Sequence, residues 1–346
     1  MRRTQNKTGA PIRHRVENTK KDTVNLTLDD YFEKWIDRRY ATAAKQSTPY
    51  RYEHWYHNHI KEVLGGRQID SLRRSDILDF QSEQAKEYSP STVNYTILLL
   101  KIILNDAVSE EIIQDNPADR IKDLKSSAIP AASTKHRALT EEEQKRFMQA
   151  AKASFYYEFF AFLLLTGMRH GEAAALTWED VDYDDNVIHI TKSLTFDKEG
   201  HVIIGTPKSA ASIRDIPMNE KIRLVLQMQR DKTVALLGEA EMTHRGMKQL
   251  IFYPRPHPEG VLHNTTANLA LKRILEEMHQ QDDPIEQFSL HALRDTFATR
   301  FIEQGGRPQT LKTILGHSSL AMTMDLYSHV LPNTRQKEMD RVKIRI

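Results

Sequence analysis

Apolar side chains recur every three to four residues along the N-terminal third of the chain, and this spacing predicts helices. In "TLDDYFEKWIDRRY", Leu28, Phe32 and Trp35 fall on one helical face. The segment "SPSTVNYTILLLKIILNDAVSEEII" predicts a second helix, with Ser89 placed to cap its N-terminus. We therefore expect a small all-helical domain over residues 27–121.

The pattern changes after a segment that has no periodicity. Residues 122–136, "KDLKSSAIPAASTKH", are rich in Ser, Ala and Lys and are typical of a linker. Thr140 and Glu143 then fit a capping box at the start of a second domain. Within it, "NVIHITKSLTF", "HVIIG" and "ASIRDIPM" alternate like short strands between helical stretches. The expected fold is mainly α with a small β component, an α+β arrangement with a small antiparallel sheet.

Composition narrows the classes of protein. The chain has 346 residues, enough for two domains, and the apolar run "FFAFLLL" at 159–165 is far shorter than the roughly 18 residues of a membrane span. The charged start lacks a secretory apolar region, so we expect a cytoplasmic protein that does not bind membranes. With no cysteine, thiol nucleophiles, disulfides and thiolate metal sites are excluded.

Charge is concentrated at the N-terminus. The net charge of the chain is only +2, but residues 1–26 carry seven Lys or Arg against two acidic residues. This basic N-terminal arm is either a solvated tail or a segment that contacts DNA, and composition does not decide between them.

Three other kinds of site fail on spacing. Asp180, Asp182 and Asp184 have the spacing of a calcium loop, but Asp185 stands where such a loop needs glycine. Only two of the three histidines in "HWYHNH" share a helical face, which is weak support for a metal site. Neither a phosphate-binding loop nor a dinucleotide-binding loop occurs, so we expect no nucleotide, metal or other cofactor.

Two segments place cationic groups near helix ends or faces. In "LLLTGMRHGEAAAL" a helix ends at Thr166-Gly167 and another starts near Arg169, where an anion is favoured. Glu172 either pairs with Arg169 on the surface or orients it. In "SLHALRDTFATRF", His291 and Arg294 lie together at the edge of an apolar stripe, where both can also be purely structural.

The remaining candidates follow in turns and in the last helix. Lys208 lies in a turn of "GTPKSAASIRDIP", where a lysine is usually only solvated. Gly316 suits a left-handed helix cap, which holds His317 in a tight turn. Tyr327 lies on the same helical side as Leu320, so periodicity alone favours a packed tyrosine.

In order and spacing, "TGMRHGE", "TPKSAASIRDIP", "HALRDTFAT", "LGHSSLAMT" and "MDLYSHV" resemble the tyrosine recombinases of the phage integrase family. The likeness covers residues 26–331. It implies that 27–121 form a core-site DNA-binding domain, that 137–331 form the catalytic domain, and that the chain is a site-specific DNA strand transferase. The residues that it implies are catalytic are Arg169, Lys208, His291, Arg294, His317 and Tyr327, with Glu172 as a supporting group. Met168 and Asp295 depart from the common motif without replacing a catalytic group.

The resemblance implies a reaction that uses neither metal nor ATP. Tyr327 would form a 3'-phosphotyrosine intermediate, and Lys208 would protonate the leaving 5'-oxygen. His291 is the first candidate to assist deprotonation of Tyr327, with a water or an anionic phosphate oxygen as alternatives. Arg169, Arg294 and His317 would hold the charge that develops at phosphorus. A type IB topoisomerase-like activity and a non-catalytic DNA-binding regulator remain alternative functions.

The resemblance also implies partners. We expect a free monomer that assembles as a homotetramer on double-stranded DNA recombination sites and exchanges strands through a Holliday junction, with accessory DNA-bending or directionality factors as further partners. An integrase of a mobile element is the expected context. The first 26 residues are too few for a folded arm-binding domain. The apolar alternation at the end of 332–346 suggests a C-terminal tail that docks either on a neighbouring protomer or on its own domain.

Overall fold

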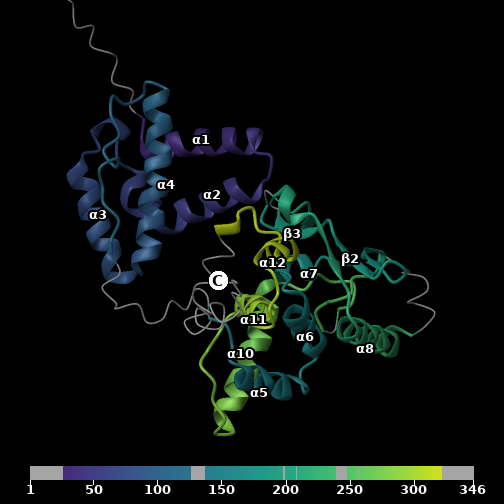
Figure 1. Cartoon of the computed structure of the whole chain (residues 1–346). Coiled ribbons are helices and arrows are strands. Elements are labelled where there is room, and N and C mark those ends of the chain that lie inside the picture. The colour runs from purple at the N-terminus through teal and green to yellow at the C-terminus, as the bar shows by residue number, and fades with distance from the viewer. Residues whose placement is uncertain are drawn as a thin grey trace, which may run out of the picture. The chain divides into compact units, whose positions relative to one another are not determined.

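The computed structural model describes residues 26–125, 137–197, 199–207, 209–238, 248–255 and 257–321 (Figure 1). These residues form two compact units, one within the first 126 residues and one after them. We call them the helical unit and the mixed unit and describe each by itself. In neither unit does the described part of the chain contain a helix that is long and apolar enough to cross a membrane.

The helical unit has four α-helices that enclose one core. They are α1 (Leu28–Thr42), α2 (Ser47–His59), α3 (Arg74–Glu87) and α4 (Pro90–Ser109). Short π and 3-10 turns follow α2, at Lys61–Gly65 and Ile69–Ser71. The helix α1 packs against α2, and α4 packs against both α2 and α3 (Figure 1).

Local signals start these helices where the sequence predicts. The Thr27 side chain accepts a hydrogen bond from the Asp30 backbone and Asp30 returns one, which is a complete capping box. At the start of α4 the Ser89 side chain accepts a hydrogen bond from the Thr92 backbone, and Pro90 stands at the first position of the helix. Inside, the ring of Phe32 stacks on that of Tyr56 with their centroids 3.6 Å apart.

The mixed unit is built around α6, a helix of "YEFFAFLLLT" with a long apolar run. Its residues 159–163 and Thr166 are buried, and Leu164 and Leu165 are partly buried. It packs against α5, α7, α8 and α11, and α11 in turn packs against α10 and α12 (Figure 1). The helices of this unit are α5 (Glu141–Ala151), α6 (Tyr157–Thr166), α7 (His170–Ala173), α8 (Glu220–Leu237), α10 (Asn264–Gln280), α11 (Leu290–Glu303) and α12 (Pro308–Leu315).

The β structure is divided between two small antiparallel sheets. The strands are β1 (Val181–Asp182), β2 (Val187–Ile190), β3 (Ser193–Phe196), β4 (Val202–Gly205) and β5 (Arg214–Pro217). One sheet has the order β1-β2-β5, with Ile188 opposite Ile216, and the other is the β3-β4 hairpin. The hairpin is therefore an excursion between two neighbouring strands of the first sheet.

The expected fold class is confirmed: the chain is mainly helical with a small antiparallel β component. The acidic stretch that has part of the spacing of a calcium loop contains the turn between β1 and β2. There the Asp182 carboxylate accepts hydrogen bonds from the backbone of Asp184 and Asp185.

Candidate active site

Three of the expected site residues line one hollow of about 280 Å³ in the mixed unit. Arg169 comes from the start of α7, while His291 and Arg294 come from α11. The remaining residues that line this hollow are Met168, His170, Asn264, Asn268, Ser289 and Leu290. The structure thus brings together groups more than 120 residues apart in sequence.

Arg169 is held by a buried carboxylate. Its side chain, 37% exposed, donates from Nη1 to Oε1 of Glu172 at 2.8 Å, and its backbone N–H donates to Oε2 at 3.0 Å. Glu172 is only 2% exposed. Burial acts to raise the pKa of Glu172, but the hydrogen bonds and charge of Arg214 and the charge of Arg169 outweigh burial and lower it. Glu172 is therefore a buried partner of Arg169 and not a surface one.

Arg294 lies deeper than the helical pattern predicts. The pattern places Arg294 at the edge of an apolar stripe, but Arg294 is only 2% exposed, and Ala298 on the same face is fully buried. The prediction of an edge position is wrong because two distant carbonyls cover this face. Arg294 donates from Nη1 to the Gly167 carbonyl at 2.7 Å and from Nη2 to the Leu315 carbonyl at 2.6 Å.

Burial, and next the charge of Arg169, lower the pKa of Arg294 to about 9, so this guanidinium is still charged at neutral pH. Arg169 also donates to the Leu315 carbonyl, at 3.5 Å, which brings the two guanidinium groups to the same oxygen. Two adjacent cations at a hollow attract an anion.

His317 follows directly on the left-handed residue that ends α12. Gly316 has φ 65°, the conformation that favours glycine, and the His317 N–H donates to the Lys312 carbonyl. Burial, followed by the charges of Arg294 and Arg169, lowers the pKa of His317 to about 4. The imidazole is therefore neutral at pH 7, close to both arginines.

Among the expected catalytic residues that the structure describes, His291 is the most exposed. Its side chain is 53% exposed, and its Nε2 lies 3.8 Å from Oδ1 of Asp295, one helical turn later. The departure from the common motif at Asp295 thus supplies a buried carboxylate, 8% exposed at its side chain, beside a candidate base. Its spacing of four residues from His291 was the available signal in the sequence.

Lys208 and Tyr327 lie outside the described residues, as does the tail at 332–346. Their assignment stays a prediction from the sequence.

Sequence reasoning missed Arg214 and His170. Arg214 begins β5, and its side chain, 4% exposed, donates to both carboxylate oxygens of Glu172. No local pattern distinguishes it from a strand arginine that faces solvent. His170 lines the hollow beside Arg169, and burial lowers its pKa to about 4. Its position directly after Arg169 was the only clue.

One group of described side chains has donor atoms close enough for a metal ion, at the turn of the β3-β4 hairpin. Donor atoms of Asp197, Glu199 and His201 lie within 4.8 Å of one another. Asp197 already accepts hydrogen bonds from the backbone and the ring of His201, so the turn accounts for this grouping. It is separate from the residues that line the hollow at Arg169 and Arg294.

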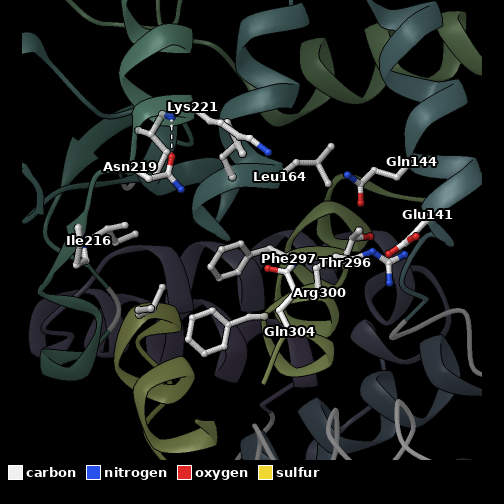
Figure 2. A pocket seen from close by; sticks show the side chains of 15 residues that line it. Glu141, Gln144, Leu164, Ile216, Asn219, Lys221, Thr296, Phe297, Arg300 and Gln304 are labelled. Carbon is white, nitrogen blue, oxygen red and sulfur yellow. Dashed lines mark hydrogen bonds between the residues drawn. The ribbon is translucent and has the colours of Figure 1, made fainter. Parts of the chain in front are cut away.

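A larger hollow of about 530 Å³ lies elsewhere in the mixed unit (Figure 2). Phe297 lies near its middle, with Asn219 and Lys221 along one side and Glu141 and Gln144 along the other. None of the expected catalytic residues that the structure describes lines it. Apolar side chains lie at its centre, and its charged lining residues are Glu141, Lys221 and Arg300.

Family comparisons agree with this arrangement. The model described as phage integrase family matches residues 137–334, more than half of the chain, and the model described as phage integrase, N-terminal SAM-like domain matches residues 27–84. The transposase from transposon Tn916 of Enterococcus faecalis is 28% identical over 295 residues, which are 82% of this chain and 69% of the relative. The ICEBs1 integrase of Bacillus subtilis is 29% identical over 284 residues, covering 81% and 73%.

Solved structures share the fold. The integrase of the Tn1549 transposon, in complex with a circular intermediate DNA, superposes with a TM-score of 0.75 at 23% identity, covering 92% of this chain and all of the other. A lambda integrase tetramer bound to a Holliday junction superposes with a TM-score of 0.62 at 18% identity, covering 90% and 83%. With the family model matched across the whole of the site described above, the chain belongs to the phage integrase family of tyrosine recombinases.

Proposed function

We propose that this chain cuts and rejoins DNA at the recombination sites of a mobile element, with Tyr327 as nucleophile. The observation that carries the proposal is the convergence of Arg169, Arg294 and His317 near one hollow, from three separated parts of the chain. The relatives named above, a transposase and integrases, support the mobile-element context. We infer that the helical unit, 27–121, binds the core site.

The two arginines would hold the scissile phosphate. A guanidinium group presents paired N–H donors that match two non-bridging oxygens, and its charge opposes the charge that grows at phosphorus. Arg294 has two of its donors engaged with carbonyls, which fixes the plane of the group before DNA arrives. Each such preorganised donor contributes about 3 to 4 kcal/mol to lowering a barrier.

His317 would act as a neutral hydrogen-bond donor. Its pKa of about 4 in the free protein means that it adds no third positive charge at pH 7. Its ring can still donate one N–H to a phosphate oxygen. A neutral donor beside two cations avoids the additional repulsion that a histidinium would introduce.

In the proposed step the Tyr327 oxygen attacks phosphorus and the bond to the 5'-oxygen breaks. The phenol loses its proton and the 5'-oxygen gains one, so the products are a 3'-phosphotyrosine and a 5'-hydroxyl. A tyrosine of ordinary pKa is ionised to about one part in a thousand at pH 7, which costs about 4 kcal/mol without a base. His291, paired with Asp295, is the proposed base, and Lys208 is the proposed acid for the leaving oxygen.

Rejoining would follow the same path in reverse. One phosphoester replaces another, so bond energy is retained and no nucleotide is consumed. Ordered cutting and rejoining of two duplexes passes through a Holliday junction, and the lambda integrase tetramer with that junction supports an assembly of four protomers here. Accessory DNA-bending or directionality factors belong to the same proposal.

We propose that the tail at 332–346 of one protomer docks in the larger hollow of its neighbour. The tail alternates Val342, Ile344 and Ile346 with basic residues. The hollow offers Phe297 at its centre to the apolar positions of the tail and Glu141 at its margin to a basic one, and Lys221 and Arg300 also line it (Figure 2). Deletion of 333–346 should weaken tetramer assembly on DNA, and unchanged assembly and recombination would refute the docking.

A covalent trapping assay tests the reaction. The substrate is nicked DNA that spans the joined ends of the element, and the product is an adduct stable in SDS. We expect the adduct from the native chain and none from Tyr327→Phe, whereas Arg169→Lys and Arg294→Lys should slow it by about 100- to 1,000-fold. Arg223→Lys, at a half-buried arginine that does not line the hollow, is the control and should react at the native rate.

The same assay separates the alternatives. Recombinant joints between two labelled sites support a recombinase, whereas relaxation of supercoiled DNA without joints indicates a topoisomerase-like swivel. If the native chain binds the site but forms no Tyr327-dependent adduct, the chain is a DNA-binding regulator and the proposal fails.

A further inference from the structure

A single buried arginine joins the parts of the site that carry Arg169 and His317. Arg214 begins β5, away from the hollow itself, and its side chain is 4% exposed. A guanidinium so deeply buried is costly to remove from water unless most of its donors are engaged. The groups to which Arg214 donates hydrogen bonds therefore indicate its role.

Arg214 makes four hydrogen bonds to three separate segments. Nη1 and Nη2 donate to the two carboxylate oxygens of Glu172, at 3.1 and 2.8 Å. Nη1 also donates to the Ser212 carbonyl at 2.8 Å, and Nε donates to the Ile314 carbonyl at 2.5 Å. The paired contact with Glu172 sets the plane and the angle of that carboxylate, which a single-point contact would not.

Glu172 passes this constraint to Arg169. The oxygen that accepts from Arg214 Nη1 also accepts from Arg169 Nη1, and the other oxygen accepts from the Arg169 backbone. Glu172 is thus shared between an arginine at the hollow and one behind it. A change in the position of Arg214 moves the carboxylate, and with it the guanidinium of Arg169.

The other end of Arg214 holds the C-terminus of α12. Arg214 donates to the Ile314 carbonyl, while Arg294 and Arg169 donate to the adjacent Leu315 carbonyl, so three cations satisfy the last carbonyls of this helix. Gly316 follows at once, and a Cβ there would lie 3.0 Å from Nη1 of Arg214 and 2.9 Å from the Ala211 carbonyl. The turn that presents His317 is therefore packed directly on Arg214.

We propose that Arg214 is a positioning residue for strand cleavage. It fixes Glu172, and so Arg169, and it fixes the end of α12, and so His317, in one arrangement before DNA binds. The inference rests on the site proposed above and adds to it a group that does not touch the DNA. Among the described side chains, Arg169 at the hollow is the other one with hydrogen bonds to both Glu172 and the end of α12.

The test compares Arg214→Lys with the control Arg223→Lys under single-turnover conditions with saturating enzyme. Lysine keeps the charge but cannot form the paired contact. We expect adduct formation to slow by about 100-fold in Arg214→Lys, the effect of a displacement of about 1 Å at a reacting centre, while DNA affinity in a gel-shift assay changes less than about 3-fold. Arg223→Lys should match the native chain in both measurements.

A second substrate separates positioning from general damage. A methylphosphonate at the scissile position replaces one charged non-bridging oxygen with a methyl group, so the placement of Arg169 matters less there. We expect the defect of Arg214→Lys to shrink to less than about 10-fold on this DNA, because only the electrostatic part of the barrier depends on the arginines. A structural defect would slow both substrates equally.

Glu172→Asp tests the same link from its other end. It keeps the charge and shortens the side chain by one methylene, and we expect the same dependence on the substrate. If Arg214→Lys fails to fold, as its circular dichroism spectrum would report, Glu172→Asp alone decides. Native rates in the folded variants, or equal defects on both substrates, overturn this inference and leave the proposed function standing. A native chain without a Tyr327-dependent adduct overturns both.

Discussion

Both units pair arginines with carboxylates, and the two sets of pairs differ in burial. In the helical unit Arg39 pairs with Asp106 at side-chain exposures of 41% and 35%, and its guanidinium lies 4.9 Å from the centre of the Trp35 ring. In the mixed unit Arg214 pairs with Glu172 at 4% and 2%. The same two chemical groups therefore meet in water in one unit and almost without water in the other.

The difference separates stability from orientation. An exposed pair is screened by solvent and contributes about 0 to 1 kcal/mol. A buried pair loses several kcal/mol of hydration per ion, which its attraction repays only with good geometry and further hydrogen bonds. The buried pair of the mixed unit is thus a poor device for stability but fixes two side chains in one geometry, as a reaction at a phosphate requires. Four predictions test this contrast.

The largest expected effect is that of Glu172→Ala. The variant leaves Arg214 buried without a carboxylate, and we expect the mixed unit to lose about 3 to 5 kcal/mol of unfolding free energy. The comparison in the helical unit is Glu110→Ala, which removes the pair with Arg38 at exposures of 37% and 51% and the hydrogen bond from the Tyr31 hydroxyl, and it should cost less than about 2 kcal/mol. Urea unfolding of the full chain measures both, and equal losses would contradict the contrast.

Acid should destabilise the mixed unit through His170. Burial, and next the charge of His263, lower its pKa to about 4 in the folded chain, against about 6.5 when unfolded. The unfolded chain takes up this proton as the pH falls below 6.5 while the folded chain does not, so stability is complete above 6.5 and declines towards pH 4. The decline attributable to this group is at most about 3 kcal/mol.

His170→Gln should flatten that part of the pH profile of unfolding. His59 in the helical unit also has a lowered pKa, through burial and then through His54, but it is less deeply buried. His59→Gln should therefore flatten the profile less, and the reverse order would count against burial as the cause.

Gly316→Ala should show how tightly the buried arginines are packed. Alanine in the left-handed conformation costs about 1 to 2 kcal/mol, and at this position its Cβ would also meet the Ala211 carbonyl at 2.9 Å. We expect a total of about 2 to 3 kcal/mol. Gly305→Ala is the control, because its φ is also positive and nothing lies within 4 Å of the added atom, so it should cost about 1 kcal/mol. Thermal or urea unfolding of the two variants gives the difference.

The smallest expected effect is that of Arg39→Lys in the helical unit. Lysine keeps the charge beside Asp106, and the pair is open to solvent, so the loss should be below about 1 kcal/mol and should diminish further at 1 M salt. A loss comparable to that of Glu172→Ala would mean that exposure does not govern these pairs. Denaturant midpoints at low and high salt check it.

Much of the fold could be predicted because its signals are local. One helix begins at Ser89 with Pro90, another begins at Thr140 with Glu143, and a third ends at Gly316, each through contacts within four residues. The structure has each of these as expected. The alternating stretches also became strands. The periodicity did not reveal that these strands divide into two sheets, because pairing joins residues across intervening chain.

The amino-acid sequence by itself determined where helices start and stop and which residue types are present for phosphate chemistry. Only the tertiary structure decided that Arg294 is buried, that Glu172 is shared between Arg169 and Arg214, and that three guanidinium groups donate to the last carbonyls of α12. The physical reason is the range of the interactions. Caps and helical faces depend on neighbours along the chain. The burial and pairing of a charge depend on carbonyls and carboxylates that are tens of residues away in sequence and come close only when the unit folds.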